Sequence, residues 1–472
     1  MDNIRDKYID KDIDKDIDKN IDKNIDKNID ETNGDVDRQK KTVGFMTLGC
    51  KVNQYESEAV STIFEDSGYK IVDFNQVADV YVINTCTVTN LSDRKSRQAI
   101  RKAKKQNQDS IIVVMGCYAQ TSSGEVAEID GVNLVIGTKD RNRIIEFISR
   151  IEAGECRINA VDNIMTTSIF EDLKLNTYKE RTRAYIKIQE GCSQFCSYCI
   201  IPYARGPVRS RKPEDILEEV KTLADNGFLE IVLTGIHIAS YGRDLKTIDL
   251  LGLIKQIHQI EGIKRIRLGS VEPRTISEQF VEAAKQLPKL CPHYHLSLQS
   301  GCDETLKAMN RKYTSEDYMK CVKLLKDNIK DVSLTTDLMV GFPGETDENF
   351  EQSLSFAQRV GFLKIHVFKY SPRKGTPAAS MQNQIPPSIK DERSEKMLKL
   401  SDSLEKQYMS QYLGKAVEVI FEQHVNGQKD LYEGLTANYM RVVAKSSEDI
   451  KGKMLNVKLE SLEGTHFLGN II

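Results

Sequence analysis

The chain has 472 residues, of which 40% are hydrophobic and 29% charged, an ordinary balance for a globular protein. Its formal net charge of −2 excludes a general attraction to nucleic acid or membrane, so any RNA-binding surface must be local. No apolar run reaches the roughly 18 residues that a membrane span needs, and no secretory signal is recognisable. We therefore expect a cytoplasmic protein without a membrane partner.

The beginning of the chain repeats with a period of four, placing isoleucine at every fourth position of residues 9–30. One apolar residue per turn buries too little surface to offset the loss of chain entropy. Residues 1–40 are therefore predicted to be a disordered, low-complexity extension.

Strands and helices alternate from Lys41 onward, which predicts a parallel sheet with crossover helices. This first domain is expected over residues 41–155, and a polar linker over residues 156–177. The strands are predicted at 43–48, 80–84 and 111–115, and the helices at 57–66 and 92–105.

A longer alternation fills residues 178–408, where six strand-sized segments are each followed by a helix-sized one. This pattern predicts a partial (βα)6 barrel whose active site lies at the carboxyl ends of the strands. Residues 409–472 change to short strands between turn residues, as in a small closed β-barrel. The expected fold class is therefore α/β, with three domains.

Ten cysteines in a reducing compartment favour metal or redox chemistry over disulfide bonds. Three of them, Cys192, Cys196 and Cys199, stand within eight residues directly after the first barrel strand. Such a loop can hold an iron-sulfur cubane and leave one iron without a protein ligand. A structural zinc site is the alternative, but zinc wants a fourth ligand and none is apparent nearby.

A second set of cysteines, Cys50, Cys86 and Cys117, is spread along the first domain, each after a predicted parallel strand. The carboxyl ends of neighbouring parallel strands meet at one edge of a sheet, so we expect these thiols to converge. Any one of them alone would be taken for a buried core residue. Three equivalent placements favour a second cluster, whereas Cys156, Cys291, Cys302 and Cys321 lack partner spacing and are expected to be structural.

The C-x3-C-x2-C loop, with Tyr198 before its last cysteine, resembles the radical S-adenosylmethionine (SAM) superfamily. The resemblance implies that SAM binds at the open iron held by the catalytic cysteines of this loop. Segments 233–236, 270–273 and 337–345 resemble the cofactor-contacting turns of that superfamily. The implied SAM contacts are Tyr198, Thr234, Gly235, Ser270, Glu272, Gly341 and Glu345.

The first domain, with Gly49-Cys-Lys-Val-Asn-Gln-Tyr-Glu56 around its first cysteine, resembles the methylthiotransferases, and this resemblance covers residues 41–472. It implies two [4Fe-4S] clusters, an electron donor such as flavodoxin or ferredoxin, a sulfur source and a monomeric enzyme. The motif is most similar to the branch that acts on N6-threonylcarbamoyladenosine in tRNA, just 3′ of the anticodon. The implied reaction methylthiolates C2 of that base and consumes two SAM molecules.

Other interpretations stay open. The substrate could be isopentenyladenosine in tRNA or a ribosomal protein, as in other branches of the same family. A protein of another class, a non-catalytic iron-sulfur protein that binds RNA or transfers electrons, is the second alternative.

Two basic clusters are candidates for the RNA surface. Residues 94–105 carry seven positive charges and no acid, and a further group of arginines follows the cysteine loop. We expect phosphate contacts from Arg97, Arg101, Arg205, Arg209 and Arg211, although a charge run is often only a solvated face. The C-terminal barrel resembles a TRAM domain, an OB-like RNA-binding module, mainly through residues 434–442. A barrel that only packs against the rest of the chain is the alternative.

Overall fold

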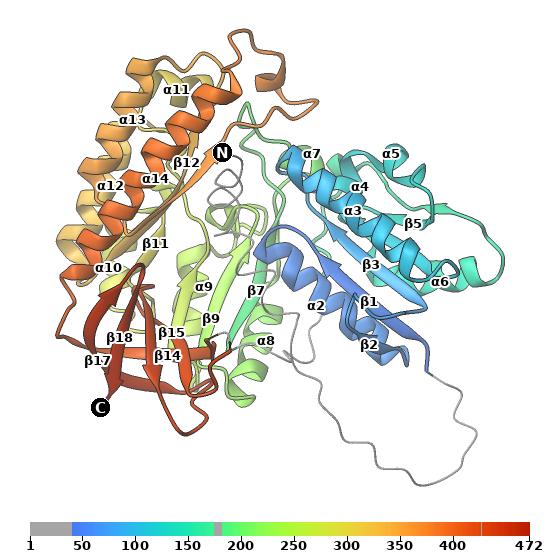
Figure 1. The fold of residues 1–472 in the computed structure, drawn as a ribbon, viewed down its shortest axis with the longest axis horizontal. Coiled ribbons are helices and arrows are strands. Elements are labelled where there is room, and N and C mark those ends of the chain that lie inside the picture. Colours follow the sequence, from blue (N-terminus) through green and yellow to red (C-terminus); the bar gives the residue numbers. More distant parts are fainter. Residues whose placement is uncertain (1–39, 174–181, 426) are drawn as a thin grey trace.

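The computed structural model describes residues 40–173, 182–425 and 427–472, which form three domains (Figure 1). The predicted extension lies outside the described residues except for Lys40. Within the described part of the chain, no helix is both long and apolar enough to cross a bilayer.

The N-terminal domain is built on a six-stranded sheet in the order β2-β1-β3-β4-β5-β6, and all its strand pairings are parallel. The strands are β1 (Thr42–Thr47), β2 (Lys70–Val72), β3 (Val80–Thr85), β4 (Ile111–Gly116), β5 (Val132–Ile136) and β6 (Ile158–Asn159). The last of these lies in the segment predicted as a linker, so the sheet extends past residue 155.

Helices cover both faces of this sheet. On one face, α2 (Lys51–Asp66) and α6 (Ile144–Glu152) bury Phe64 and Phe147 against Val82 and Val113. On the other face lie α3 (Asn90–Gln106) and the short helices α4 (Cys117–Thr121) and α5 (Ser123–Ala127). Successive strand residues face opposite sides of a sheet, and both sides are covered here, so the strands are almost continuously apolar.

The central domain confirms the predicted open barrel of six parallel strands. They are β7 (Arg183–Glu190), β9 (Glu230–Gly235), β10 (Arg265–Leu268), β11 (His293–His295), β12 (Ser333–Val340) and β13 (Lys364–Lys369). The sheet β10-β9-β7 is joined to the sheet β11-β12-β13 by single parallel bridges, Ile266 to Leu290 and Val271 to Leu296. The two-residue strand β8 (Arg209–Ser210) adds to β7 in the antiparallel direction.

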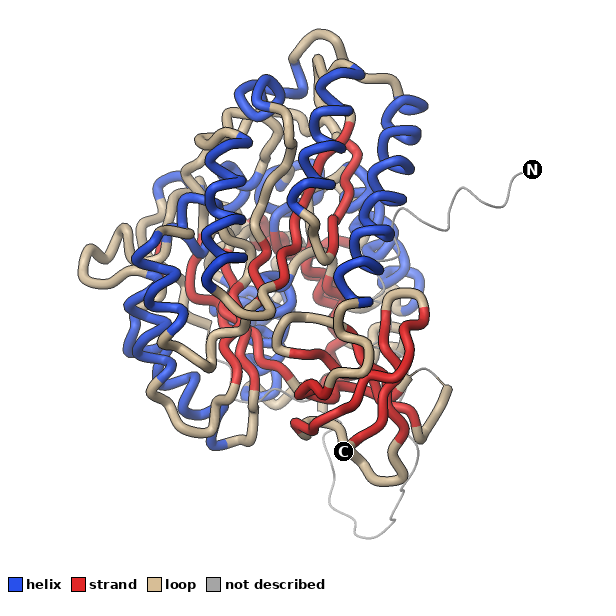
Figure 2. Tube along the Cα trace, turned by 90° about the vertical axis from the view of Figure 1, so that its left-hand side faces the viewer, coloured by secondary structure: helices blue, strands red, loops and turns tan. Residues whose placement is uncertain are grey.

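Helices surround the barrel on its outer side (Figures 1 and 2). They are α8 (Pro213–Asp225), α9 (Leu250–His258), α10 (Glu278–Lys285), α11 (Asp303–Ala308), α12 (Ser315–Asn328), α13 (Asp347–Val360) and α14 (Pro387–Ser410). Strand residues such as Ile186, Leu233 and Ile266 pack against this helical layer in the main core. Because strand side chains alternate, the residues between them face the barrel interior, and most of these are polar.

The C-terminal domain is a closed five-stranded barrel in the order β14-β15-β16-β18-β17. Its strands are β14 (Ala416–His424), β15 (Leu431–Thr436), β16 (Arg441–Lys445), β17 (Met454–Glu463) and β18 (His466–Ile471). Figures 1 and 2 both place it at the lower end of the molecule, under the strands of the central domain.

The turn between β15 and β16 joins this barrel to the amino ends of the central strands. The ring of Tyr439 stacks on His293 with centroids 4.4 Å apart, and the Arg267 guanidinium lies 4.9 Å from the Tyr439 centroid. Ser333 Oγ donates a hydrogen bond to the Asn438 carbonyl at 2.6 Å. Much of the stretch 434–442 therefore packs against the central domain, as the second interpretation of this barrel expected.

Candidate functional site

The cysteine loop of the central domain leaves β7 through Gly191, whose φ is +75°. A Cβ atom on Gly191 would lie 1.9 Å from the Pro207 carbonyl oxygen, so only glycine fits. The Cys192 amide donates to the Gly206 carbonyl at 3.0 Å, and the Cys199 amide donates to the Cys196 carbonyl at 3.0 Å. The loop is thus a tight turn that holds its three thiols at the carboxyl end of the barrel.

In the second set of cysteines, too, the chain turns at glycines with positive φ. Gly49 and Gly116 precede Cys50 and Cys117, with φ of +110° and +97°. A Cβ atom would lie 2.8 Å from Cys86 Cβ in the first case and 2.4 Å from Asn84 Oδ1 in the second. The carboxyl ends of β1, β3 and β4 therefore bring the three cysteines together.

Two thiols of each set have raised pKa values, Cys86 and Cys117 in one set and Cys192 and Cys199 in the other. Burial, and then the charges of Cys117 and Cys50, raise the pKa of Cys86 to about 12. Burial and Cys196 likewise raise the pKa of Cys199 to about 12. Such thiols stay protonated at neutral pH unless a cation stabilises the thiolate, and iron is such a cation. The donor sets therefore fit iron-sulfur clusters.

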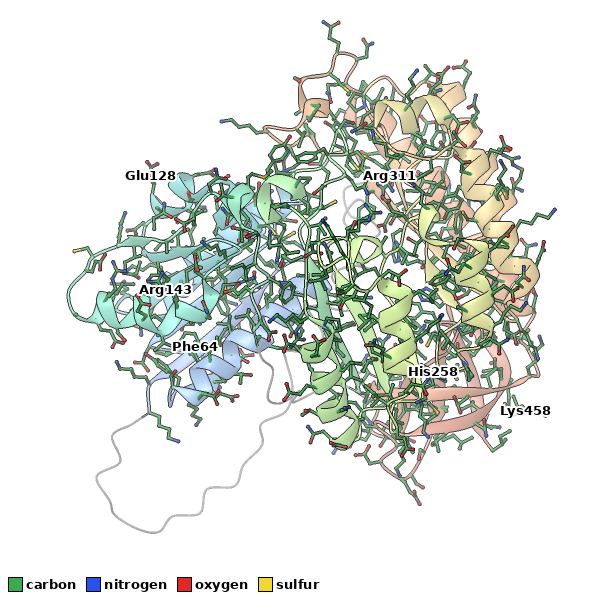
Figure 3. The ribbon with its side chains drawn as sticks, turned by 180° about the vertical axis from the view of Figure 1, so that it is seen from behind. Phe64, Glu128, Arg143, His258, Arg311 and Lys458 are labelled. Carbon is green, nitrogen blue, oxygen red and sulfur yellow. The ribbon has the colours of Figure 1, made fainter. Side chains whose placement is uncertain are left out.

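Each cysteine set has one thiol that accepts a hydrogen bond from an arginine, and the two arginines are different residues. Arg205 Nε lies 3.1 Å from Cys117 Sγ, and Arg311 Nη1 lies 3.4 Å from Cys196 Sγ. Hydrogen bonds to cluster sulfurs adjust reduction potentials, so these contacts suit a redox centre. Figure 3 shows Arg311 in the upper part of the molecule, between the N-terminal domain and the helices around the barrel.

In the described segments, no group of three or more Cys, His, Asp or Glu side chains is arranged as the site of a metal ion. Each thiolate of a cubane binds a different iron, so cluster ligands lie farther apart than the ligands of one ion. The fit of clusters thus rests on the donor sets and on the glycine turns that present them.

Several predicted SAM contacts gather at the carboxyl ends of β9 and β10. Thr234 is buried, Gly235 approaches β7 so closely that a Cβ atom would lie 2.8 Å from the Gln189 carbonyl, and Ser270 is exposed. The Glu272 carboxylate lies 3.2 Å from His237 Nε2 and 3.3 Å from Arg311 Nη2. Burial raises the pKa of Glu272, but His237 and Arg311 outweigh burial and hold that pKa below its ordinary value.

The other predicted SAM contacts lie on the far side of the barrel mouth. Tyr198 packs beside Phe342, and Gly341 turns with φ of +72°. The Glu345 carboxylate accepts from the Gly341 amide at 2.8 Å and from Arg393 at 2.6 Å. These partners hold Glu345 in the turn after β12, and its contact with SAM stays a prediction.

Three of the five predicted RNA contacts are buried, with exposed fractions of 0% for Arg205 and 3% for Arg209 and Arg211. Arg205 pairs with Glu56, and Arg211 lies 2.8 Å from Asp172. This corrects the expectation of phosphate contacts, because the guanidinium groups are engaged inside the protein. The other two remain candidates on α3, where Arg101 is exposed and Arg97 is partly so.

A buried carboxylate joins the N-terminal domain to the barrel. Glu56 of α2 lies 2.6 Å from Arg141, 2.7 Å from Lys187 and 2.5 Å from Arg205. Burial raises its pKa, but these three cations outweigh burial and hold the pKa well below the ordinary value. The cluster fixes one cysteine set relative to the other. Sequence reasoning missed this role, although Glu56 ends the motif that begins at Gly49.

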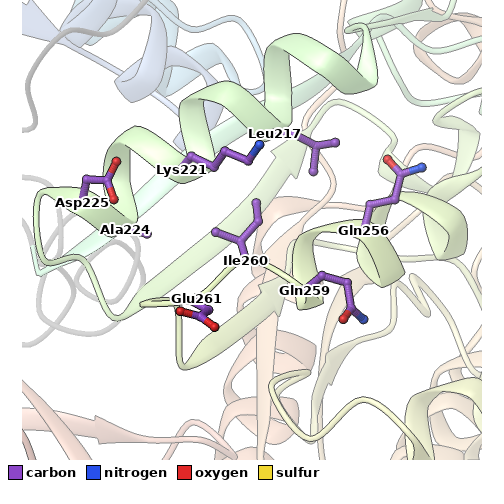
Figure 4. A pocket seen from close by; sticks show the side chains of 8 residues that line it. All are labelled: Leu217, Lys221, Ala224, Asp225, Gln256, Gln259, Ile260 and Glu261. Carbon is purple, nitrogen blue, oxygen red and sulfur yellow. The ribbon is translucent and has the colours of Figure 1, made fainter.

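A surface groove of ≈ 490 Å³ lies between α8 on one side and the end of α9 with the segment that follows it on the other (Figure 4). Leu217 and Lys221 line one side, and Gln256 and Ile260 line the other. The groove is on the helical outside of the barrel, whereas the cysteines lie at the carboxyl ends of the strands. It is therefore not part of the site.

Comparisons with known proteins agree with this geometry. Residues 186–357 match the family described as Radical SAM superfamily, and residues 42–137 match Uncharacterized protein family UPF0004. The radical S-adenosylmethionine methyltransferase TsrM of Kitasatospora setae shares the fold, with a TM-score of 0.55 at 16% identity over 72% of this chain and 77% of that chain.

Two relatives are similar over most of their length. Threonylcarbamoyladenosine tRNA methylthiotransferase MtaB of Bacillus subtilis (strain 168) is 46% identical, over 89% of this chain and 93% of that protein. The tRNA-2-methylthio-N(6)-dimethylallyladenosine synthase of Alkaliphilus oremlandii (strain OhILAs) is 39% identical, over 90% and 92%. The chain therefore belongs to the radical SAM methylthiotransferase family, and with it to the enzymes that use SAM and a [4Fe-4S] cluster.

Proposed function

We propose that this protein methylthiolates C2 of N6-threonylcarbamoyladenosine in tRNA, at the nucleotide just 3′ of the anticodon. The observation that carries the proposal is the pair of cysteine sets, each presented by glycine turns at the carboxyl ends of parallel strands. Three relatives named as threonylcarbamoyladenosine tRNA methylthiotransferases, at 46%, 37% and 36% identity, support this substrate.

We assign one [4Fe-4S] cluster to Cys192, Cys196 and Cys199 and a second to Cys50, Cys86 and Cys117. SAM bound at the first cluster supplies a radical that can remove hydrogen from C2, a position that acid–base groups cannot deprotonate. Within the protein, Thr234, Gly235, Ser270 and Glu272 would hold SAM at the ends of β9 and β10. Tyr198 and Gly341 would border it on the opposite side.

The chain's own contribution is positioning. The Glu56 cluster holds the two cysteine sets in one arrangement, and Arg205 and Arg311 each hold one thiol by a hydrogen bond. Fixing reactants in a productive geometry is worth several orders of magnitude in rate. No triad or paired carboxylate is needed for this chemistry.

The proposal includes partners. We place phosphate contacts on α3, at Arg97 and Arg101, near the second cysteine set. The enzyme also needs an electron donor such as flavodoxin or ferredoxin and a source of sulfur, and we expect it to act as a cytoplasmic monomer. The working units are residues 41–159, which include β6, and residues 178–408 and 409–472.

Mass spectrometry of tRNA nucleosides tests the proposal. Cells that lack the gene should lose 2-methylthio-N6-threonylcarbamoyladenosine, and the wild-type gene should restore it. A Cys199→Ala gene should not restore it, whereas Cys156→Ala should, because Cys156 is exposed and lies outside both sets. A nucleoside profile unchanged by deletion would reject the proposal.

A second candidate substrate is dimethylallyladenosine, because relatives named for that product are up to 39% identical over most of the chain. The same nucleoside profile separates the two substrates. Loss of the methylthio group from dimethylallyladenosine alone would favour this alternative.

A further inference from the structure

Lys51 reaches from the N-terminal domain into the central barrel. It is the first residue of α2 and follows Cys50 directly. Its Nζ atom lies 5.6 Å from the centroid of the Tyr185 ring on β7. Tyr185 alternates with Ile186, which packs against the outer helices, so Tyr185 faces the barrel interior.

The charge of Lys51 acts across this interior. Burial raises the pKa of Asp337 on β12, a strand of the opposite wall, but His295, His366 and Lys51 outweigh burial and hold that pKa below its ordinary value. Lys51 also contributes, after larger causes, to the lowered pKa of His366 on β13. Burial is the main reason that the pKa of His366 falls to about 4, so this imidazole is neutral at physiological pH. Asp337 lies within 3.3 Å of a different group, Nε2 of His295.

Three cations near the cysteine sets have a carboxylate close by, and Lys51 differs from them. Arg205, Lys187 and Arg311 lie 2.5 Å, 2.7 Å and 3.3 Å from a carboxylate oxygen. Among the residues that the structure describes, the Lys51 ammonium makes no hydrogen bond or ion pair, and it lies over the ring of Tyr185. A partly buried ammonium without an anion favours binding of one.

His295 lies in the same region, and both of its ring nitrogens have neighbours within the protein. Its Nε2 atom faces Asp337 Oδ2 at 3.3 Å, and its Nδ1 atom lies 3.0 Å from Thr335 Oγ1. Buried polar atoms are usually satisfied in this way, and the Lys51 ammonium is not. Lys51 thus points to a ligand with a negative group.

The threonylcarbamoyl group has this chemistry. Its threonine is linked through the amine, so its carboxylate is free, and its hydroxyl and carbamoyl groups can form hydrogen bonds. A dimethylallyl group is apolar and would leave Lys51 without a partner in the barrel. We propose that Lys51 binds the carboxylate of the threonylcarbamoyl group inside the barrel and so selects this nucleoside. This inference rests on the proposed function and deepens it.

The test compares Lys51→Gln, which removes the charge, with Lys51→Arg, which keeps it. Each reconstituted enzyme is titrated with tRNA that carries N6-threonylcarbamoyladenosine and with the same tRNA carrying unmodified adenosine. Loss of a charge-assisted hydrogen bond should raise the Kd for the modified tRNA about tenfold or more in Lys51→Gln. The Kd for unmodified tRNA should stay the same, and Lys51→Arg should bind both tRNAs nearly as the wild type does.

A second arm changes the substrate instead of the protein, so it does not depend on how a variant folds. An anticodon stem-loop RNA in which threoninamide replaces threonine keeps the size of the group and removes its charge. Wild-type enzyme should bind this RNA about tenfold more weakly than the natural one, and Lys51→Gln should bind the two equally. Equal binding of both RNAs by wild-type enzyme would overturn the inference.

Failure of the inference is distinguishable from failure of the proposed function. If wild-type enzyme methylthiolates the natural RNA and Lys51→Gln retains the full preference for the modified tRNA, Lys51 is not the carboxylate site. If wild-type enzyme with both clusters loaded does not methylthiolate this RNA at all, the proposed substrate itself is wrong.

Discussion

At the scale of single residues, a glycine stands before three of the six cysteines assigned to the clusters. Gly49, Gly116 and Gly191 have φ of +110°, +97° and +75°, a region that side-chain-bearing residues rarely adopt. In each case a Cβ atom would also lie under 3 Å from a neighbouring atom. The Gly-Cys pair is therefore a structural unit that turns the chain sharply so that the thiol faces the cluster.

Gly116→Ala tests this unit. The added methyl group meets Asn84 Oδ1 at 2.4 Å and the Thr85 carbonyl at 2.6 Å, at a φ that alanine disfavours. We expect a loss of roughly 2–4 kcal/mol in the free energy of unfolding and less iron bound by the N-terminal domain. Urea unfolding and iron analysis measure both effects.

The matched control is Gly124→Ala in α5, where a Cβ atom meets nothing within 4 Å. Alanine favours a helix over glycine, so this change should leave stability equal or slightly higher. Equal iron content and stability in the two variants would contradict the structural role of Gly116.

The cysteines could be predicted from the sequence, but their charged neighbours could not. Thiol spacing is local along the chain or follows strand ends, whereas the partners Lys187 and Arg205 stand 131 and 149 positions from Glu56. A run of arginines after the loop is equally compatible with an RNA surface and with a buried network. Only the packing of α2 on the barrel shows that Arg205 belongs to the network.

At the scale of elements, α2 serves two domains. Its residues Val60 and Phe64 pack on the N-terminal sheet, while the Tyr55 hydroxyl donates to the Leu173 carbonyl at 3.0 Å. Glu56 on the same helix carries the buried ion cluster. The alternation of strands and helices predicted such an element, but sequence periodicity could not show which of its polar residues are buried.

Glu56→Gln tests how much this helix depends on its charge. The substitution leaves Arg141, Lys187 and Arg205 without their shared anion, although Glu190 still lies 3.2 Å from Arg205. Breaking a buried ion pair by removing one partner typically costs about 3–5 kcal/mol, and we expect a loss of that order in chemical unfolding.

The control for this change is Glu146→Gln. Glu146 pairs with Arg143 at 2.7 Å on the surface, where both side chains are about half exposed. Its loss should change stability little, because water screens such pairs. A similar small effect at Glu56 would show that the buried cluster does not hold the domains together.

At the scale of the whole molecule, the C-terminal barrel closes the end of the central barrel opposite the cysteines. The Tyr439 ring lies between His293 and Arg267, and Arg265 donates to the Leu435 carbonyl at 2.9 Å. Strand patterning predicted this domain as a barrel, but domain docking is a long-range contact that the sequence pattern does not encode.

Tyr439→Ala should loosen this docking. Removing a stacked aromatic ring costs roughly 1–3 kcal/mol, and the segment joining the domains should become more open to protease. We expect faster trypsin cleavage at Lys415, which is exposed between α14 and β14. Tyr203→Ala, at an exposed ring of the central domain, should digest like the wild type, and so should Tyr439→Ala if its ring contributes nothing to docking.

The buried carboxylate of Glu56 also bears on how a nucleotide gets in. Pulling the two cysteine-bearing domains apart would separate Glu56 from Lys187 and Arg205 and leave Glu190 as their carboxylate partner, so the buried cluster opposes such an opening. We therefore expect the RNA to move instead, by turning a single base out of its stack. Turning out a base costs little free energy in an unpaired loop, whereas in a duplex its base pair must first be broken. Glu56 would in this way help the enzyme to select an unpaired RNA loop over a duplex, although it lies far from the reacting atoms.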